Sequence, residues 1–145
     1  MATRHVVRPP PVEDPLAATG RPLRWGVVAT GRIARTVASQ LVRLEDAVLH
    51  AVSSRDPARA RAFAGDLGAS VAYGDGAGRL GYERLAADPD VDVVYVTTPH
   101  GQHYEVTKPL LEAGKHVLVE KAFTITGDEA EALVDLARAR GVFLM

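Results

Sequence analysis

The chain has 145 residues, 47% of them apolar, and a formal net charge of −1, which suffices for one buried core and excludes two ordinary domains. The near-neutral charge offers no basic field for a phosphate backbone or an anionic membrane, and no apolar run approaches the roughly 20 residues of a membrane span. The absence of cysteine excludes disulfides and thiolate chemistry and fits a reducing compartment, so we expect a cytoplasmic protein. From these features together, we expect no nucleic-acid partner, no membrane partner and no metal site.

The first 22 residues differ in composition from the rest of the chain. They hold five of its nine prolines, with mixed charges and no apolar periodicity. Such a segment cannot bury enough surface to offset the entropy lost on ordering. We interpret residues 1–22 as a mobile tail that precedes a domain spanning residues 23–145.

From Leu23 onward, short β-branched runs alternate with helical segments rich in Ala, Arg and Leu, which is typical of a parallel sheet with crossover helices. The predicted strands are 24–29, 48–53, 71–73, 91–97, 116–120 and 142–144. The predicted helices are about 32–44, 57–67, 82–87, 104–113 and 128–140. We therefore expect an α/β fold, a Rossmann-type doubly wound parallel sheet in a single domain, with the glycine-rich stretch 74–81 as a surface loop.

The turn after the first predicted strand occupies the position of the phosphate-binding G-x-G-x-x-G loop of dinucleotide folds. It reads Ala29-Thr30-Gly31-Arg32-Ile33-Ala34. Alanine replaces the first and third glycines, while Gly31 is kept where backbone must approach a pyrophosphate, at the positive end of the following helix. The pattern alone fits a purely structural turn equally well. As a functional site, it predicts cofactor contacts from residues 29–33.

The second predicted strand ends in Ser53, Ser54 and Arg55. An NAD-selective site normally has an acidic residue at this point, whereas a hydroxyl and a guanidinium suit a 2′-phosphate. We therefore expect a preference for NADP, with NAD as the alternative. Arg55 could instead be a solvated loop arginine, and the neighbouring Asp56 could reach a ribose after a modest shift of the loop.

Two more groups of polar residues follow later strands, at the sheet edge where open α/β sheets bind ligands. The first contains Thr98, Pro99, His100 and His103, and the second contains Glu120 and Lys121. The segments Thr98-Pro99-His100 with His103, and Ala113-Gly114-Lys115-His116-Val117-Leu118-Val119-Glu120-Lys121, resemble the T-P-x-x-x-H and A-G-K-H-V-x-x-E-K-P signatures of the Gfo/Idh/MocA family. With the glycine loop, the resemblance covers residues 25–145.

The resemblance implies an NAD(P)-dependent oxidoreductase that acts on a sugar, a polyol or a diol. Lys121 would be the catalytic residue, in contact with both substrate and nicotinamide ribose, and Glu120 would help to hold the nicotinamide end. Thr98, Pro99 and His100 would run beneath the cofactor. His103 would cap the next helix or reach the nicotinamide ribose. The alternative for Lys121, His100 and His103 is a purely structural role.

The chain also departs from the family pattern. Ala122 stands where the family usually has proline, and this variant looks like the branch of dihydrodiol dehydrogenase and NADP-dependent xylose dehydrogenase. The stretch 74–81 is longer than the usual link. Family members continue for about another domain, which supplies the substrate pocket, further catalytic residues and the oligomer interface.

The last predicted strand runs to the end of the sequence. We therefore expect a cofactor domain without the usual C-terminal substrate domain, a fragment or truncated form with little activity alone. A substrate would bind only with a second domain or partner chain, and the chain could form a homo-oligomer. The alternatives are a stand-alone dinucleotide-binding regulatory module, or subunit working with a partner, and a remnant that folds without a ligand.

Overall fold

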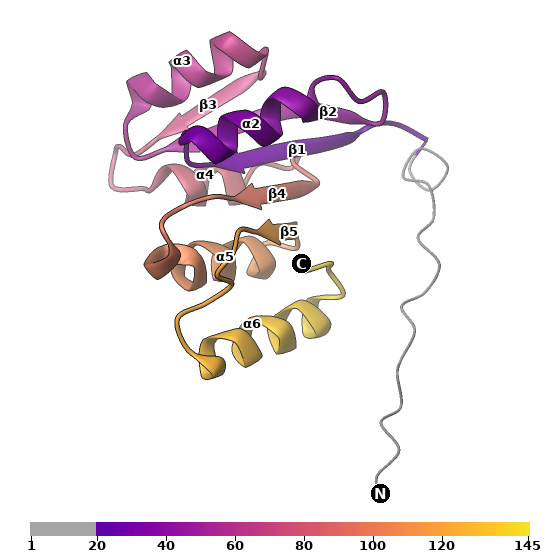
Figure 1. The fold of residues 1–145 in the computed structure, drawn as a ribbon, viewed down its shortest axis with the longest axis vertical. Helices are drawn as coiled ribbons and strands as arrows, with labels where there is room; N and C mark the ends of the chain where they lie inside the picture. The colour runs from indigo at the N-terminus through magenta and orange to yellow at the C-terminus, as the bar shows by residue number, and fades with distance from the viewer. Residues whose placement is uncertain (1–19) are drawn as a thin grey trace, which may run out of the picture.

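The computed structural model describes residues 20–145 (Figure 1). Most of the tail predicted over residues 1–22 lies outside the described residues and is not tested. The remaining chain forms a five-stranded sheet in the order β3-β2-β1-β4-β5, with every neighbouring pair parallel. The strands are β1 (Leu23–Val28), β2 (Ala47–Ser54), β3 (Val71–Gly74), β4 (Val93–Val96) and β5 (His116–Val119).

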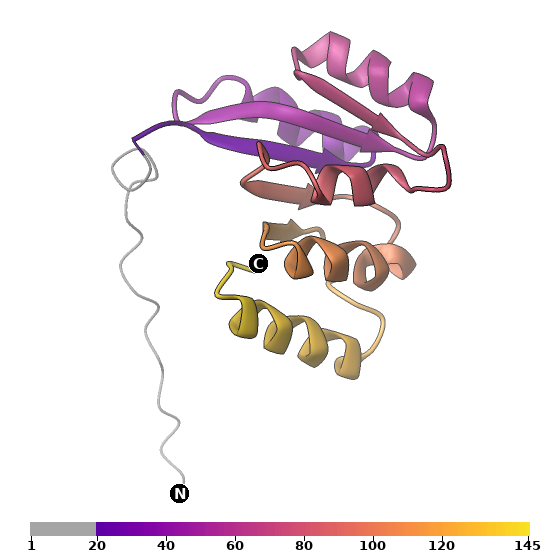
Figure 2. The ribbon, with the colours of Figure 1, turned by 180° about the vertical axis from the view of Figure 1, so that it is seen from behind.

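Helices lie on both faces of this sheet, as expected for a doubly wound fold (Figures 1 and 2). They are α2 (Arg32–Leu41), α3 (Pro57–Leu67), α4 (Gly81–Ala86), α5 (His103–Glu112) and α6 (Gly127–Arg140), with a short 3₁₀ turn, η1 (His100–Gln102). Side chains of α2 and α3 share one apolar cluster, and those of α4, α5 and α6 share the other. The predicted α/β Rossmann-type class is therefore confirmed.

Alternating side chains of the central strands supply both clusters. Val27 of β1 and Tyr95 of β4 pack with α2 and α3, whereas Val28 and Val94 pack with the helices on the other face. All four are at most 3% exposed, which explains why these strands read as continuous apolar runs. The sheet is thus buried on both sides where β1 meets β4.

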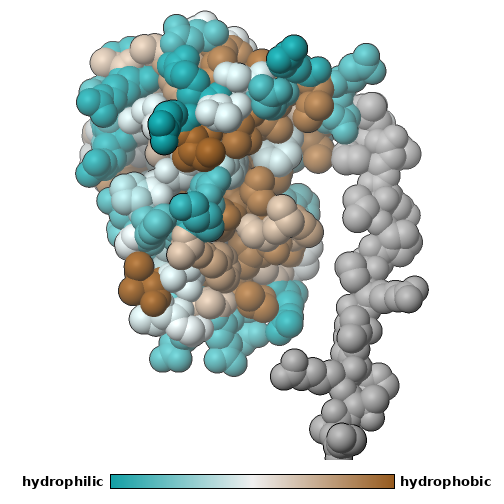
Figure 3. Space-filling view, in the orientation of Figure 1, coloured by the Kyte–Doolittle hydropathy of each residue, from teal (hydrophilic) through white to brown (hydrophobic). Residues whose placement is uncertain are grey.

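The described helices cover only part of the sheet face on which α2 and α3 lie. In Figure 1, α2 and α3 lie over β1, β2 and β3, and no described helix lies in front of β4 and β5. Figure 3 shows apolar residues gathered on this part of the same face. Phe143 and Met145, in the segment beside β5, are 58% and 65% exposed. Among residues 20–145, no helix covers this part of the sheet on the α2 face.

Several element boundaries differ from those predicted. Helix α2 ends at Leu41 rather than Leu44, because the chain turns there and leaves the Leu44 side chain 52% exposed. Strand β4 begins at Val93, two residues later than predicted. The predicted strand 142–144 is reduced to one parallel bridge between Leu144 and Val117, at the outer edge of β5. No helix in residues 20–145 is long and apolar enough to cross a membrane.

Asp92 joins the starts of β1 and β4. Its carboxylate accepts hydrogen bonds from the backbone N–H of Arg24 at 2.8 Å, from the Arg24 guanidinium, and from the Arg21 guanidinium at 2.7 and 2.9 Å. The hydrogen bonds from Arg21, followed by those from Arg24, hold the pKa of Asp92 far below its usual range. The ionised carboxylate therefore stabilises the folded state.

Replacing Asp92 by Asn tests this contribution. A carboxylate with a depressed folded-state pKa stabilises a protein fully above its unfolded-state pKa of about 4, and this stabilisation is lost as the pH falls below that value. The free energy of unfolding should therefore be lower for Asp92→Asn at pH 7, and the difference from the wild type should shrink below about pH 4. Urea unfolding of both proteins between pH 7 and pH values below about 4 measures the free energy of unfolding of each and the difference between them.

Asp135 provides the control, because its side chain is 66% exposed and pairs only at 3.4 Å with Arg138 on the surface of α6. Asp135→Asn should leave the pH profile almost unchanged, since exposed pairs contribute little. Parallel profiles for wild type and Asp92→Asn would contradict the role assigned to Asp92.

Candidate functional site

A cleft of about 970 Å³ opens at the carboxyl-terminal edge of the sheet. Its walls come from the loops that follow β1, β2, β3 and β4, so it spans the point where the strand order reverses. Open α/β sheets bind their ligands at this point. The cleft brings together these residues predicted from the sequence: Ala29, Thr30, Gly31, Ser53, Ser54, Arg55, Thr98, Pro99 and His100.

The turn between β1 and α2 forms one end of the cleft. Gly31 is the N-cap residue of α2, and no side chain caps the helix there. A Cβ placed on Gly31 would meet no atom within 4 Å, so the space next to the turn is open. Arg32 and Ile33 belong to the first helical turn, whose N–H groups lack partners within the helix. This is the arrangement that binds an anion at a helix N-terminus.

The two alanines that replace glycines fit this turn in different ways. Ala29 has φ of 83°, a left-handed conformation that glycine adopts more readily. Ala34 is fully buried and packs with Val27 and Leu49, so its small side chain allows α2 to approach the sheet. The fold therefore keeps the shape of the glycine loop despite both replacements.

Two arginines line the cleft beyond β2, Arg55 in the loop and Arg59 in the first turn of α3. Asp56 is engaged as the N-cap of α3, where its Oδ1 accepts the N–H of Ala58 at 2.8 Å. Turning this carboxylate toward a ribose would remove the cap, which costs about 0.5–2 kcal/mol. The end of β2 is therefore better suited to a phosphate than to a ribose hydroxyl. Arg59 was missed in the sequence, although it lies one helical turn after Arg55.

The loop between β3 and α4, predicted as a surface loop, also forms part of the wall. It makes a tight turn through a bridge between Gly76 and Arg79. The Asp75 carboxylate accepts the Gly81 N–H at 2.7 Å and so caps α4. Asp75 and Leu80 line the cleft. No motif in the sequence indicated that these residues would face a ligand site.

The loop after β4 holds a buried hydroxyl that has no hydrogen-bond partner among the described residues. This group is Thr98 Oγ1, and Thr98 lines the cleft, followed by the exposed Pro99 and His100. The preceding Thr97 Oγ1 donates to the Val28 carbonyl at 3.0 Å and joins β4 to β1. A buried hydroxyl without a partner is costly, so Thr98 fits a site whose ligand supplies one.

The loop after β5 is held by buried side chains, and its residues do not line the cleft. The Glu120 Oε1 accepts the Tyr95 hydroxyl, and Glu120 Oε2 accepts the Lys121 backbone N–H at 3.0 Å. The hydrogen bond from Tyr95 lowers the pKa of Glu120, and burial raises that of Tyr95. The Lys121 side chain is exposed.

His103 joins the two predicted motifs. It is fully buried at the start of α5, with Nε2 2.8 Å from the Thr98 carbonyl oxygen and Nδ1 2.8 Å from that of Ala122. His103 therefore lies between the loops that follow β4 and β5 and does not line the cleft. The peptide bond between Lys121 and Ala122, in the second of these loops, is cis. Its predicted contact with a cofactor stays a prediction, as do those of Glu120 and Lys121.

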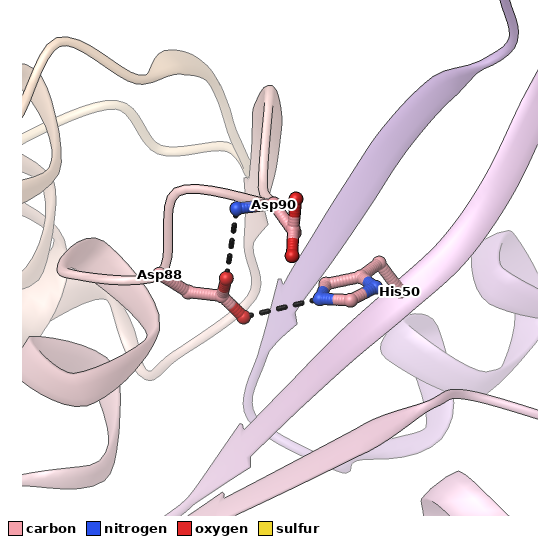
Figure 4. A group of neighbouring side chains, drawn as sticks. All are labelled: His50, Asp88 and Asp90. Atoms are coloured by element: carbon pink, nitrogen blue, oxygen red, sulfur yellow. Dashed lines mark hydrogen bonds and ion pairs between the residues drawn. The ribbon is translucent and has the colours of Figure 1, made fainter.

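A group with metal-like spacing lies away from the cleft, where His50 of β2 meets Asp88 and Asp90 in the segment before β4 (Figure 4). His50 Nε2 lies 3.1 Å from Asp88 Oδ2, which also accepts the Tyr73 hydroxyl at 2.9 Å. The other oxygen of Asp88 accepts the Asp90 N–H, and the Asp90 carboxylate pairs with Arg24. Because these carboxylates already have donors and a cationic partner, we interpret the group as structural.

Comparison with known proteins places these features in context. A family model for oxidoreductases with an NAD-binding Rossmann fold matches residues 23–145. The D-xylose 1-dehydrogenase (NADP(+)) of Hypocrea jecorina is 44% identical over 142 residues, which are 88% of this chain and 35% of that protein. The trans-1,2-dihydrobenzene-1,2-diol dehydrogenase of Mus musculus is 44% identical over 126 residues, 85% of this chain and 36% of that protein. The chain thus spans about a third of these curated relatives.

Solved structures give the same picture. The structure of KijD10, a 3-ketoreductase from Actinomadura kijaniata in complex with NADP and TDP-benzene, has a TM-score of 0.78 at 36% identity, over 86% of this chain and 37% of that chain. An NAD binding oxidoreductase from Klebsiella pneumoniae has a TM-score of 0.76 at 31% identity, over 86% and 33% of the two chains. These similarities confirm the resemblance found in the sequence motifs.

The unpaired hydroxyl of Thr98 leads to a prediction about the ligand-free protein. Thr98→Val should raise the free energy of unfolding by about 1 kcal/mol, because a buried hydroxyl without a partner destabilises the folded state. Thr107→Val should do the same, since Thr107 Oγ1 in α5 is also buried without a partner among the described residues. Urea unfolding measures both. A lower stability of Thr98→Val would show that its hydroxyl is hydrogen-bonded.

Proposed function

The chain belongs to the Gfo/Idh/MocA family of oxidoreductases, with an NAD-binding Rossmann fold, and we propose that it binds NADP as the cofactor domain of an oxidoreductase acting on a sugar, a polyol or a diol. The observation that carries the choice of cofactor is the end of β2. Ser54 and Arg55, together with Arg59 in the first turn of α3, line the cleft there, while Asp56 is engaged in capping α3. Forked guanidinium donors suit a 2′-phosphate.

The remaining walls of the cleft support an extended dinucleotide. The uncapped first turn of α2 suits the pyrophosphate, because its N–H groups and the helix dipole attract an anion. Thr98 offers a buried hydroxyl that has no partner among the described residues. The relatives named for NADP, or solved with it, support the same cofactor.

We propose that the nicotinamide end lies toward the loops after β4 and β5. The bound cofactor would supply the acceptor or donor of a hydride. Lys121 carries an exposed ammonium group beside this edge of the sheet, and an ammonium group can donate a proton to a developing alkoxide. Glu120 and His103 hold the backbone on either side of Lys121. Their proposed role is to orient the lysine.

The substrate class rests on the curated relatives, whose names refer to a sugar and a dihydrodiol. Differential binding of the transition state requires groups around the reacting carbon. The described cleft has groups suited to phosphates and a nucleotide, and Lys121 is exposed. We therefore expect cofactor binding with little turnover from residues 23–145 alone.

The cofactor proposal predicts tight binding of NADPH and weaker binding of NADH, measured by isothermal titration calorimetry on the purified chain. Arg55→Ala should weaken NADPH binding by about tenfold or more, because it removes a charge-assisted hydrogen bond to the 2′-phosphate, and should leave NADH binding nearly unchanged. Arg138→Ala, on the surface of α6, is the control. Equal losses for both cofactors, or no binding by the folded wild type, would contradict the proposal.

The proposed contact of Thr98 with the bound cofactor gives a second binding prediction. Thr98→Val should weaken NADPH and NADH by a similar factor, about fivefold, because the hydroxyl is assigned to the part that the two cofactors share. Thr107→Val removes a buried hydroxyl outside the cleft and should leave both affinities unchanged. If Thr98→Val binds both cofactors as tightly as the wild type, the hydroxyl has no part in the site.

A further inference from the structure

We propose that Tyr95 is a positioning residue for Lys121 and acts through the carboxylate of Glu120. This inference rests on the proposed function, in which Lys121 contacts the nicotinamide end of the cofactor. It assigns a role to a core residue of β4 that belongs to none of the sequence motifs.

The sheet places Tyr95 and Glu120 on the same face. Tyr95 lies opposite Leu118 in the parallel pairing of β4 with β5, and Glu120 follows Leu118 by two residues. Because side chains alternate between the faces of a strand, residues two apart point the same way. The Tyr95 hydroxyl therefore reaches the Glu120 Oε1 across two neighbouring strands.

The hydroxyl of Tyr95 is explained by this contact rather than by packing. The ring is 3% exposed and belongs to the apolar cluster under α2 and α3, where phenylalanine would fill the same space. A buried hydroxyl is tolerated when it has a hydrogen-bond partner. Glu120 is that partner, so the core of the sheet fixes the orientation of this carboxylate.

The same Glu120 carboxylate also holds the backbone of Lys121. While Oε1 accepts the Tyr95 hydroxyl, Oε2 accepts the backbone N–H of Lys121 at 3.0 Å. On the other side of Lys121, the Ala122 carbonyl oxygen lies 2.8 Å from His103 Nδ1. The exposed lysine is thus held between two buried side chains, one from β4 and one from α5.

The protonation states of the pair keep this arrangement in place. Burial, and then the hydrogen bond to Glu120, raise the pKa of Tyr95, and the hydrogen bond from Tyr95 lowers that of Glu120. The phenol therefore remains a donor and the carboxylate remains an acceptor throughout the neutral range. Removing the hydroxyl leaves Glu120 without its anchor and frees the backbone before Lys121.

The test compares two ligands, NADPH and 2′,5′-ADP, by isothermal titration calorimetry on the full chain. 2′,5′-ADP carries the adenosine and its 2′-phosphate but lacks nicotinamide. The ratio of its Kd to that of NADPH therefore measures what the nicotinamide half contributes. Tyr95→Phe should reduce this ratio by about fivefold, the size of one net hydrogen bond, while the Kd of 2′,5′-ADP stays unchanged.

Three further variants make the test specific for the bond between Tyr95 and Glu120. Tyr73→Phe removes a similar bond, from the Tyr73 hydroxyl to the Asp88 carboxylate at 2.9 Å, away from the cleft, and should leave the ratio unchanged. Glu120→Gln should lower the ratio, and adding Tyr95→Phe to it should cause little further loss, because the two residues act as one unit. In ligand-free protein, the NMR signal of the Lys121 amide should shift in Tyr95→Phe and Glu120→Gln but not in Tyr73→Phe.

The binding results distinguish failure of the inference about Tyr95 from failure of the proposed function. Equal weakening of both ligands by Tyr95→Phe would reduce Tyr95 to a structural residue and overturn the inference. An unchanged ratio in Tyr95→Phe, or a wild type that binds the two ligands equally, would overturn it too. Failure of the folded wild type to bind either ligand would overturn the proposed function. In that case, a Lys121 amide NMR signal that does not shift in Tyr95→Phe would refute the connection from Tyr95 through Glu120 to Lys121.

Discussion

The pairing of β1 with β4 is the constraint on which the rest of the structure depends. The chain first builds outward from β1 through β2 and β3, and then returns to place β4 on the other side of β1. Consequently α2 leaves β1 toward one face of the sheet, while η1 and α5 leave β4 toward the other. The two loops diverge, and the cleft lies between them. At the opposite edge, Asp92 joins the strands through the backbone and side chain of Arg24.

The candidate site has two parts that are held in different ways. The cleft is formed by the turns after β1, β2, β3 and β4, and the groups in its wall that suit a dinucleotide are N–H groups, hydroxyls and arginines. The loop carrying Lys121 depends on buried side chains instead. His103 and Tyr95 reach it from α5 and β4. One part thus has the form of a dinucleotide site, while the other fixes the backbone on either side of Lys121.

Much of the fold could be predicted because its signals are local. Alternating strands and helices gave the class, and Asp56 and Gly68 marked both ends of α3. Leu44 fits the helical spacing of α2 but lies beyond its end, because periodicity does not reveal where a chain turns away from the core. The sequence motifs also indicated nine of the 19 residues that line the cleft.

Glu120 was predicted, but Tyr95, Asp75 and Leu80 were missed, because their roles depend on contacts between distant parts of the chain. Tyr95 and Glu120 are 25 positions apart, and only the β4–β5 register brings them together. Leu80 and Asp75 reach the cleft through a turn whose position follows from the packing of α4 against the sheet. No spacing rule connects such residues, so the sequence predicts the strand ends and not the side chains that support them.

The missing side-chain cap of α2 has a consequence for the life of the protein in a cell. A helix that starts without an acceptor for its first N–H groups is completed when an anionic ligand arrives. A ligand that binds only the folded chain raises the free energy of unfolding. Once the ligand concentration exceeds the Kd, this increase grows with the logarithm of the ratio of the concentration to the Kd. The abundance of such a chain would then follow the supply of its dinucleotide, because the empty form unfolds and is degraded more readily than the loaded one.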